Sequence, residues 1–262
     1  MPLLTLIILA VVQGLTEFLP VSSSGHLVLV HNVLGDSEKA WEENLMMDVA
    51  VHVGTLFAVL LYFHKDIIEM LCLRNLSLVL RIIIGSIPVI IAGFILHQIK
   101  PDFLRSLEIM AWATIFFGIL LWVSDLRKER SKMIQEMSFL DAFLIGIAQC
   151  FALIPGTSRS GATMTAGRFL GYTRTQSAKF SLLLSIVALS GAGALLGKDV
   201  IETGNAELTQ SVLIAMGLAF ISALASIAVM MRFLERFSFA PFAIYRILLG
   251  TALLYLIYQG IL

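Results

Sequence analysis

The feature that most constrains this chain is a polar stretch set into an apolar one. Residues 13–26 read QGLTEFLPVSSSGH, between apolar residues 3–19 and a short apolar continuation over 26–34. Pro20 cannot continue a helix, whereas the serines after it are good helix N-caps. The pattern predicts helix, break, helix, with Gln13 and Glu17 four residues apart on one helix face. Irregular backbone at membrane depth persists only where it is buried in protein or lines a wet cavity.

The overall composition predicts a membrane protein. The 262 residues are 58% hydrophobic and 14% charged, with a mean hydropathy of +0.92. A soluble chain of this size would be about one quarter charged. We therefore predict an all-α polytopic membrane protein. The formal net charge is zero, which gives no indication of a nucleic-acid partner.

A second break resembles the first. Residues 139–170 carry ALIPGTSRSGATMTAGR at their centre, and both FLPVSSSG and LIPGTSRSG read apolar, Pro, small residue, hydroxyl cluster, Gly. RIIIGSIP from Arg81 and RILLGTAL from Arg246 also match. Six further apolar segments are predicted to span the membrane: 46–63, 78–97 (interrupted by Pro88), 107–124, 179–197, 211–232 and 241–260.

These segments predict an inverted-topology repeat of six transmembrane helices plus two re-entrant helical hairpins. The first repeat is 1–124, a basic cytoplasmic loop follows at 125–134, and the second, inverted repeat is 135–262, all within one integral membrane domain. Corresponding broken segments in two halves point to a site near the membrane midplane.

The distribution of basic residues predicts the orientation. Ten lie on one side: Lys65, Arg74, Arg127, Lys128, Arg130, Lys132, Arg174, Lys179, Arg232 and Arg236. Four lie on the other: Lys39, Lys100, Arg105 and Lys198. The positive-inside rule then puts the first set in the cytoplasm and both termini outside.

The two breaks together carry the chemistry of phosphoryl transfer. Arg159 has a planar fork suited to phosphate oxygens, and N–H groups at the start of a helix after PGTSRSG favour anions. Glu17 offers a hard oxygen ligand for Mg²⁺ or Ca²⁺. Ser23 or His26 could act as nucleophile or general acid/base. The alternative for Arg159 is a structural ion pair with Glu17.

At these residues the chain resembles the bacterial undecaprenyl-pyrophosphate phosphatases of the bacitracin-resistance type. QGLTEFLPVSSSGH and PGTSRSG resemble the two family signatures, and FAPFAIYR at 239–246 and IAQCFALIPG at 147–156 also match. The resemblance implies hydrolysis of undecaprenyl pyrophosphate to undecaprenyl phosphate and inorganic phosphate, which recycles the lipid carrier for peptidoglycan synthesis. It also implies a divalent cation, Mg²⁺ or Ca²⁺, the bacterial inner membrane, a site facing the periplasm, and competition from bacitracin, which sequesters the lipid.

The resemblance also assigns roles to individual positions. Glu17 matches a metal-binding carboxylate, and Gln13 occupies a position that is Glu or Gln in the family. Ser23 and His26 match the family's hydroxyl and histidine, and which of them attacks phosphorus stays open, as does the oligomeric state, a homodimer included. The other substrate-binding positions, beside Arg159, are Gly156, Thr157, Ser158, Ser160, Gly161, Thr163, Ser22 and Ser24.

Other functions share parts of this pattern. A transporter or lipid flippase is the main rival, because broken helices in inverted repeats are typical of secondary transporters. An intramembrane serine protease would leave Arg159 without a role. The Ser24–Gly25–His26 triplet lacks the Arg-x5-His-x3-Asp motif of the lipid phosphatases that share it. Asp48 and His52 are expected to be an interfacial helix start, with a supporting or access role at the site as the alternative. Arg81 and Arg246 are expected to form ion pairs or snorkel.

Overall fold

The computed structural model describes residues 3–34, 41–99, 106–126, 131–203 and 206–261. Within these ranges the chain is helical. The α-helices are α1 Leu3–Thr16, α2 Ser23–Leu34, α3 Trp41–Tyr62, α4 His64–Leu71, α5 Leu76–Ile99, α6 Leu107–Asp125, α7 Phe139–Cys150, α8 Arg159–Phe169, α9 Arg174–Thr203, α10 Ala206–Leu234 and α11 Ala240–Tyr258, and short 3-10 turns lie at Ile134–Glu136 (η3) and Phe151–Leu153 (η4).

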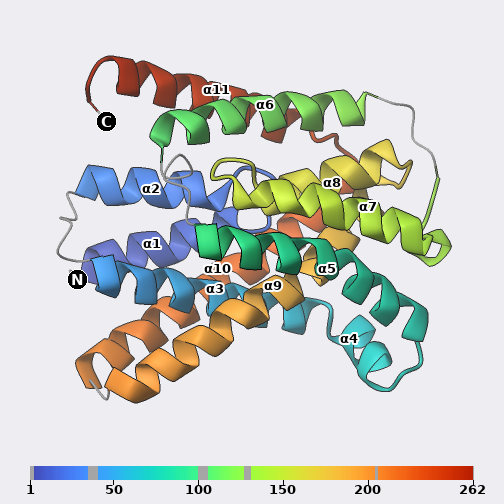
Figure 1. Cartoon of the computed structure of the whole chain (residues 1–262), viewed down its shortest axis with the longest axis horizontal. Coiled ribbons are helices and arrows are strands. Elements are labelled where there is room, and N and C mark those ends of the chain that lie inside the picture. The colour runs from blue at the N-terminus through green and yellow to red at the C-terminus, as the bar shows by residue number, and fades with distance from the viewer. Residues whose placement is uncertain (1–2, 35–40, 100–105, 127–130, 204–205, 262) are drawn as a thin grey trace.

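The two broken segments form two helical hairpins that enter the molecule from opposite ends. The α1–α2 hairpin comes from the left in Figure 1 and the α7–α8 hairpin from the right. Each packs beside a long helix, α1 along α10 and α7 along α5, while α6 pairs with α11. The start of α1 and the end of α11 lie at the same end of the molecule. The arrangement places both breaks in the middle of the bundle.

A helix covers each of the six predicted spans, but fewer satisfy the requirements for crossing a membrane. Four of the described helices are long and apolar enough, within α5, α6, α10 and α11. The bent pair α3–α4 makes a fifth candidate. For α9, the side chains beyond Gly191 lie outside the described residues. The chain is thus a multi-pass membrane protein, and the six-span inverted repeat stays a prediction.

Three details differ from the sequence-based expectation. Helix α5 continues through Pro88 instead of being interrupted there, as transmembrane helices can when neighbours satisfy the freed backbone groups. The span predicted over 46–63 is followed by the unpredicted helix α4, bent 81° from it. The matching RIIIGSIP and RILLGTAL segments also lie in non-equivalent helices, the second long helix after one hairpin and the third after the other. Much of the predicted basic loop, residues 127–130, is outside the described ranges.

The bundle is apolar outside and partly polar inside. Large apolar side chains are exposed along the outer helices, including Ile83, Phe94, Phe116 and Leu248. Buried polar side chains gather where the hairpins meet: Gln13, Glu17, Ser22, Thr157, Ser158, Ser160, Thr163 and Ser181. This distribution suits a protein that is surrounded by lipid and whose polar functional groups lie in its interior.

One buried carboxylate joins four parts of the fold at the basic end. Asp125, at the end of α6, accepts hydrogen bonds from Arg168 Nε (3.1 Å) and Arg174 Nε (2.8 Å) at Oδ1. Its Oδ2 accepts the backbone N–H of Phe239 at 2.8 Å, immediately before α11. The side chain is 3% exposed. Asp125 therefore fixes α8, α9 and α11 to the end of α6.

We predict that Asp125→Ala lowers the free energy of unfolding by about 3–5 kcal/mol, because it removes the carboxylate that balances the charge of the buried Arg168 and accepts three hydrogen bonds. That loss corresponds to a fall in Tm of roughly 10 °C for a chain of this size. Thermal unfolding of the purified protein in detergent measures it. Glu69→Ala, at an exposed position on α4, is the control and should stay within about 0.5 kcal/mol. Equal Tm values for the two variants would contradict the assigned role of Asp125.

Candidate functional site

The site is built around the carboxylate of Glu17. Helix α1 ends at Thr16, and the N–H of Glu17 still donates to the carbonyl of Gln13 at 2.9 Å. The next residues turn through Pro20, and α2 begins at Ser23. The carboxylate is only 6% exposed. Its charge must therefore be stabilised by protein groups.

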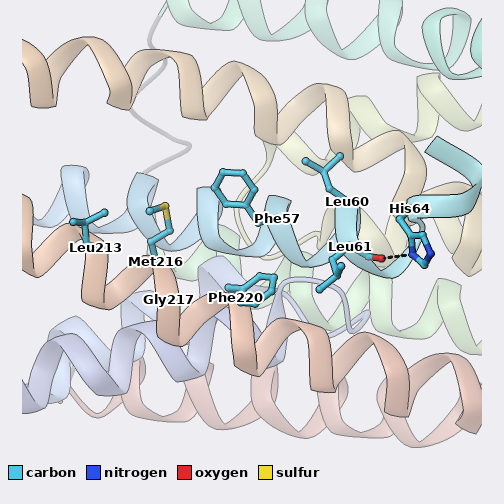
Figure 2. Close-up of a pocket in the computed structure, with 8 residues that line it drawn as sticks. All are labelled: Phe57, Leu60, Leu61, His64, Leu213, Met216, Gly217 and Phe220. Carbon is cyan, nitrogen blue, oxygen red and sulfur yellow. Dashed lines mark hydrogen bonds between the residues drawn. The ribbon is translucent and has the colours of Figure 1, made fainter. Parts of the chain in front are cut away.

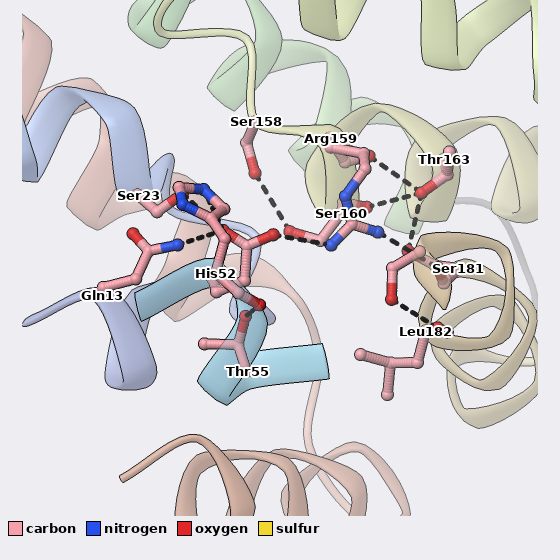
Figure 3. A network of polar contacts seen from close by, with 12 residues as sticks. Gln13, Ser23, His52, Thr55, Ser158, Arg159, Ser160, Thr163, Ser181 and Leu182 are labelled. Carbon is pink, nitrogen blue, oxygen red and sulfur yellow. Dashed lines mark hydrogen bonds and ion pairs between the residues drawn. The ribbon is translucent and has the colours of Figure 1, made fainter. Parts of the chain in front are cut away.

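Partners from both hairpins surround this carboxylate (Figure 3). Gln13 Nε2 donates to Oε2 at 2.8 Å, and Ser23 Oγ donates to the same oxygen at 2.9 Å. Arg159 Nη2, 142 residues further along the chain, donates to Oε1 at 2.9 Å. The predicted Gln13–Glu17 helix face and the predicted meeting of Glu17 with Arg159 are thus both present.

A fourth partner was not expected from the sequence. His52 of α3 places Nε2 3.7 Å from Glu17 Oε2 (Figure 3). The interfacial role expected for His52 is therefore wrong; its spacing from Asp48 was the only sequence signal, and the Asp48 side chain lies outside the described residues. His52 brings α3 into the site.

The second break presents the start of α8 to the same centre. Ser158 caps this helix, because its Oγ accepts the N–H of Gly161 at 3.1 Å. The hydroxyls of Ser158 and Ser160 lie 3.1 Å apart, and Ser160 donates to the carbonyl of Leu19 at 2.9 Å. The last bond joins the tips of the two hairpins directly.

The two breaks have the same local geometry. Ser22 and Ser158 each stand immediately before a helix, and both have a positive φ, 74° and 68°. In each case the hydroxyl lies near the hydroxyl two residues further on, 3.3 Å for Ser22–Ser24 and 3.1 Å for Ser158–Ser160. A positive φ is uncommon outside glycine and persists only where surrounding contacts impose it. The similarity of the two sequence motifs therefore reflects a shared backbone conformation.

Helix α9 orients the guanidinium of Arg159 on the side away from Glu17. Arg159 Nη1 donates to the carbonyl of Ser181 at 3.3 Å, and Thr163 shares a 2.7 Å hydrogen bond with the Ser181 hydroxyl. Thr163 also donates to the carbonyl of Arg159 at 2.9 Å. The guanidinium is therefore fixed on two sides, while its side chain stays 14% exposed.

His26 belongs to a different set of contacts from Ser23. Its Nδ1 lies 2.7 Å from the carbonyl of Ser22, so Nδ1 carries a proton that it donates there. In a neutral ring, Nε2 then accepts from the hydroxyl of Tyr245, on which His26 also stacks at 5.6 Å between ring centroids. Ser23, by contrast, bonds to Glu17. Tyr245 lies within the FAPFAIYR match, yet sequence reasoning gave it no role.

Arg246 supports the loop of the second break through hydrogen bonds to its backbone. It is fully buried, and its Nη2 donates to the carbonyls of Gly156 (2.9 Å) and Thr157 (2.7 Å). Thr114 donates to the Gly156 carbonyl as well, at 3.2 Å. The contacts found for Arg246 are thus with backbone carbonyls, not the ion pair or snorkelling expected from sequence. They hold the loop that leads into the Ser158 cap.

The donors around Glu17 bear on whether a divalent cation fits there. The described residues contain no group of three or more His, Cys, Asp or Glu side chains that could hold a metal ion. The buried Oε1 of Gln13 has no hydrogen-bond partner in the described structure. One carboxylate and one unpartnered amide oxygen suit a cation held jointly with substrate phosphates, as Mg²⁺ usually is.

The larger described pocket is elsewhere. It measures about 580 Å³ and lies between α3 and α10 (Figure 2). Its lining consists of Phe57, Leu60, Leu61, His64, Leu213, Met216, Gly217 and Phe220. The His64 ring bonds to the carbonyl of Leu61 at 2.8 Å, and Glu17 and its partners do not line it. This apolar groove has none of the chemistry of the Glu17 centre.

Fold and site together define a multi-pass helical membrane protein with a buried Glu–Arg–Ser centre between two hairpins. The chain belongs to the family described as bacitracin resistance protein BacA, whose model matches residues 6–252.

Similar proteins extend over almost the whole chain. An undecaprenyl-diphosphatase of Ruegeria pomeroyi is 42% identical over 271 residues, covering 99% of this chain and 100% of the relative. Undecaprenyl-diphosphatase 1 of Rhodospirillum rubrum is 43% identical, covering 99% and 97%. An undecaprenyl-diphosphatase of Maricaulis maris is 44% identical, covering 97% and 98%. These names favour the phosphatase interpretation over the transporter alternative.

The loop before Ser158 gives a prediction that tests its packing. Gly156 has φ +89°, and a Cβ there would lie 2.1 Å from the carbonyl oxygen of Met110. Gly260 has φ +68°, and a Cβ there would meet no other described atom within 4 Å. We expect Gly156→Ala to lower the free energy of unfolding by about 1–3 kcal/mol more than Gly260→Ala, since only the former adds overpacking to backbone strain. Thermal unfolding in detergent compares them, and equal losses would refute the tight contact.

Proposed function

We propose that this protein is an undecaprenyl-diphosphatase, which hydrolyses undecaprenyl pyrophosphate to undecaprenyl phosphate and inorganic phosphate. The observation that carries the proposal is the convergence of two helix starts on one carboxylate. Ser23 and Arg159, the first residues of α2 and α8, bond to opposite oxygens of Glu17. Helix N-termini favour anions, and two of them beside an arginine suit a diphosphate.

The substrate's diphosphate is bound in this proposal mainly by the second hairpin. Arg159 offers five N–H donors, and its bonds to Glu17 and Ser181 engage two of its nitrogens. Phosphate oxygens replace Glu17 as partner of Nη2, and the first N–H groups of α8 stabilise the charge. Ser158, Ser160, Gly161 and Thr163 maintain the shape of this helix start, and Gly156 and Thr157 hold it against Arg246.

The chemical step begins at Ser23. Its hydroxyl already donates to Glu17 Oε2, so the carboxylate orients the oxygen and takes its proton as it attacks the distal phosphorus. The Ser23 Oγ–P bond forms and the bond from that phosphorus to the bridging oxygen breaks, so undecaprenyl phosphate leaves. Water then attacks the phosphoserine, releases inorganic phosphate and restores the hydroxyl. Direct attack by His26 is the alternative nucleophilic route.

His26 and Tyr245 stand beside this step. In the described arrangement the Nε2 lone pair accepts from Tyr245, so His26 must part from Tyr245 before it can attack phosphorus or take a proton. This requirement favours Ser23 as the nucleophile. His26 can protonate the leaving group only once Nε2 has separated from Tyr245 and itself carries a proton.

A divalent cation, Mg²⁺ or Ca²⁺, is part of the proposal. Glu17 and the unpartnered Oε1 of Gln13 would hold it. The cation would neutralise charge on the diphosphate.

The proposal extends to the membrane arrangement. The shared positive φ of Ser22 and Ser158 supports an inverted repeat, with each hairpin followed by three membrane-spanning segments. The excess of basic residues at the end holding α4 and the α8–α9 turn supports placing that end in the cytoplasm. The site then opens toward the periplasmic face of the bacterial inner membrane, where bacitracin competes by sequestering the lipid.

Arg159→Ala and Glu17→Ala are each expected to lower turnover on the order of 10³-fold, since arginines that stabilise transferred phosphoryl groups contribute this much. Phosphate release from undecaprenyl pyrophosphate by purified protein in detergent measures it. Arg232→Ala, at the cytoplasmic end of α10 and away from the contacts of Glu17, is the matched control and should keep full turnover.

Chelation with EDTA should abolish release, and Mg²⁺ or Ca²⁺ should restore it. Retained turnover in either site variant would overturn the assignment, and no release by folded wild type would favour the transporter alternative.

The nucleophile is identified by trapping the covalent intermediate. With lipid pyrophosphate labelled at its distal phosphate and rapid quenching, we expect label on Ser23, as an acid-stable, alkali-labile phosphoester. Ser23→Ala should lose the label, whereas His26→Ala should keep it. An acid-labile label that depends on His26 would instead establish histidine attack.

A further inference from the structure

A small polar cavity lies away from the Glu17 centre. It measures about 120 Å³ and is enclosed by the start of α5, helix α4, the η3 turn and α9. Its polar lining includes Asp66, Asn75, Ser77, Arg81, Gln135 and Lys179. None of these residues is among those that contact Glu17.

Two cations face this cavity, against one carboxylate. Lys179 Nζ bonds to Asp66 Oδ1 at 2.6 Å, with both side chains about one quarter exposed. Arg81 donates from Nη1 to the Ile134 carbonyl (3.0 Å) and from Nη2 to the Gln135 carbonyl (3.1 Å). Its buried Nε has no hydrogen-bond partner in the described structure. The titratable lining groups, Arg81, Lys179 and Asp66, therefore carry a net charge of +1.

The start of a long helix adds to this positive potential. Helix α5 has 24 residues and begins at Leu76, within the cavity wall. Asn75 stands just before it and accepts the N–H of Leu78 at 3.1 Å through its side chain. The partial positive charge of the helix N-terminus is thus directed to the same space as Arg81 and Lys179.

We propose that this cavity binds a phosphate dianion, either the monoester head group of a lipid phosphate or free inorganic phosphate. Such a group carries a charge of about −1.5 to −2 and three strong acceptor oxygens. The Lys179 amine and the Ser77 hydroxyl are complementary donors, and the guanidinium of Arg81 adds positive charge beside them. Asp66 holds Lys179 in the empty cavity and is displaced when phosphate binds.

This inference goes beyond the proposed function and stands without it. Lys179 belongs to the predicted cytoplasmic set of basic residues, so the cavity lies at the end opposite the predicted periplasmic opening. Both products of the proposed reaction, a lipid phosphate monoester and inorganic phosphate, present the phosphate group that this cavity would bind.

Binding of inorganic phosphate is measured by calorimetry in the Arg159→Ala background, which removes the anion site at the Glu17 centre. We expect saturable binding that Lys179→Gln weakens about tenfold, the usual effect of losing one charged hydrogen bond. Asp66→Asn should strengthen binding severalfold, because it releases Lys179. Lys65→Gln, exposed on α4 and outside the cavity, is the matched control and should change nothing.

Lys179→Gln and Asp66→Asn are expected to change phosphate affinity in opposite directions, and this separates a binding role from a purely structural one. Both break the Lys179–Asp66 pair, so a purely structural pair would lower thermal stability in each and would give no gain in phosphate affinity. If Asp66→Asn weakens phosphate binding, or if Lys179→Gln leaves it unchanged, the free-phosphate form of the proposal fails.

A lipid arm distinguishes the two sources. The same variants are placed in phosphatidylcholine nanodiscs containing a minor fraction of phosphatidic acid, a phosphate monoester, or of phosphatidylglycerol, a diester. Native mass spectrometry then counts retained lipids. Phosphatidic acid retained over phosphatidylglycerol, and lost in Lys179→Gln, identifies a lipid head-group site. Phosphate binding without that lipid preference identifies a free-phosphate site. Absence of both Lys179-dependent effects overturns the proposal, whatever the turnover of the wild type.

Discussion

The ion pair between Glu17 and Arg159 is the interaction on which the rest of this structure depends. Removing an ionised carboxylate from water costs several kcal/mol unless charge and hydrogen bonds compensate. Here the compensation comes from α1 and α2 of the first hairpin, α8 of the second, and α3 outside both. The groups that make the buried charge tolerable are therefore the same groups that bring the two halves together. Site assembly and hairpin docking are one event.

The broken helices follow from the same need. An unbroken helix consumes its own N–H groups and offers a ligand at the membrane centre only side chains. Starting α2 at Ser23 and α8 at Arg159 exposes backbone N–H donors in the middle of the bundle, and the Ser158 side chain satisfies one of those in α8. The positive φ of Ser22 and Ser158 is the strain that this geometry requires. Bonds such as Ser160 to Leu19 offset it.

What the sequence could predict was mostly local. Pro20, Pro155 and the adjoining hydroxyl clusters indicated both breaks, and helical spacing placed Gln13 beside Glu17, because these signals act within a few residues. The meeting of Glu17 with Arg159 followed from the two corresponding breaks and from charge, since a buried ion needs a partner. His52, Tyr245 and Arg246 could not be assigned because their partners lie on distant helices, at positions set by packing. The bend before α4 likewise has no single helix-breaking residue to announce it.

Three ion pairs in this chain show how the same chemistry serves different purposes. Asp125 receives three donors, one from the backbone, and its partner Arg168 is only 2% exposed. Such a pair has no access to a ligand and is structural. The Arg159 side chain is 14% exposed and that of Lys179 23%, so a phosphate can reach each and replace the carboxylate. Because exchange of one anion for another conserves the charge around the cation, it avoids the cost of leaving that cation unpaired. The accessibility of the cation, more than the presence of an ion pair, therefore distinguishes Arg159 and Lys179 from the buried Arg168.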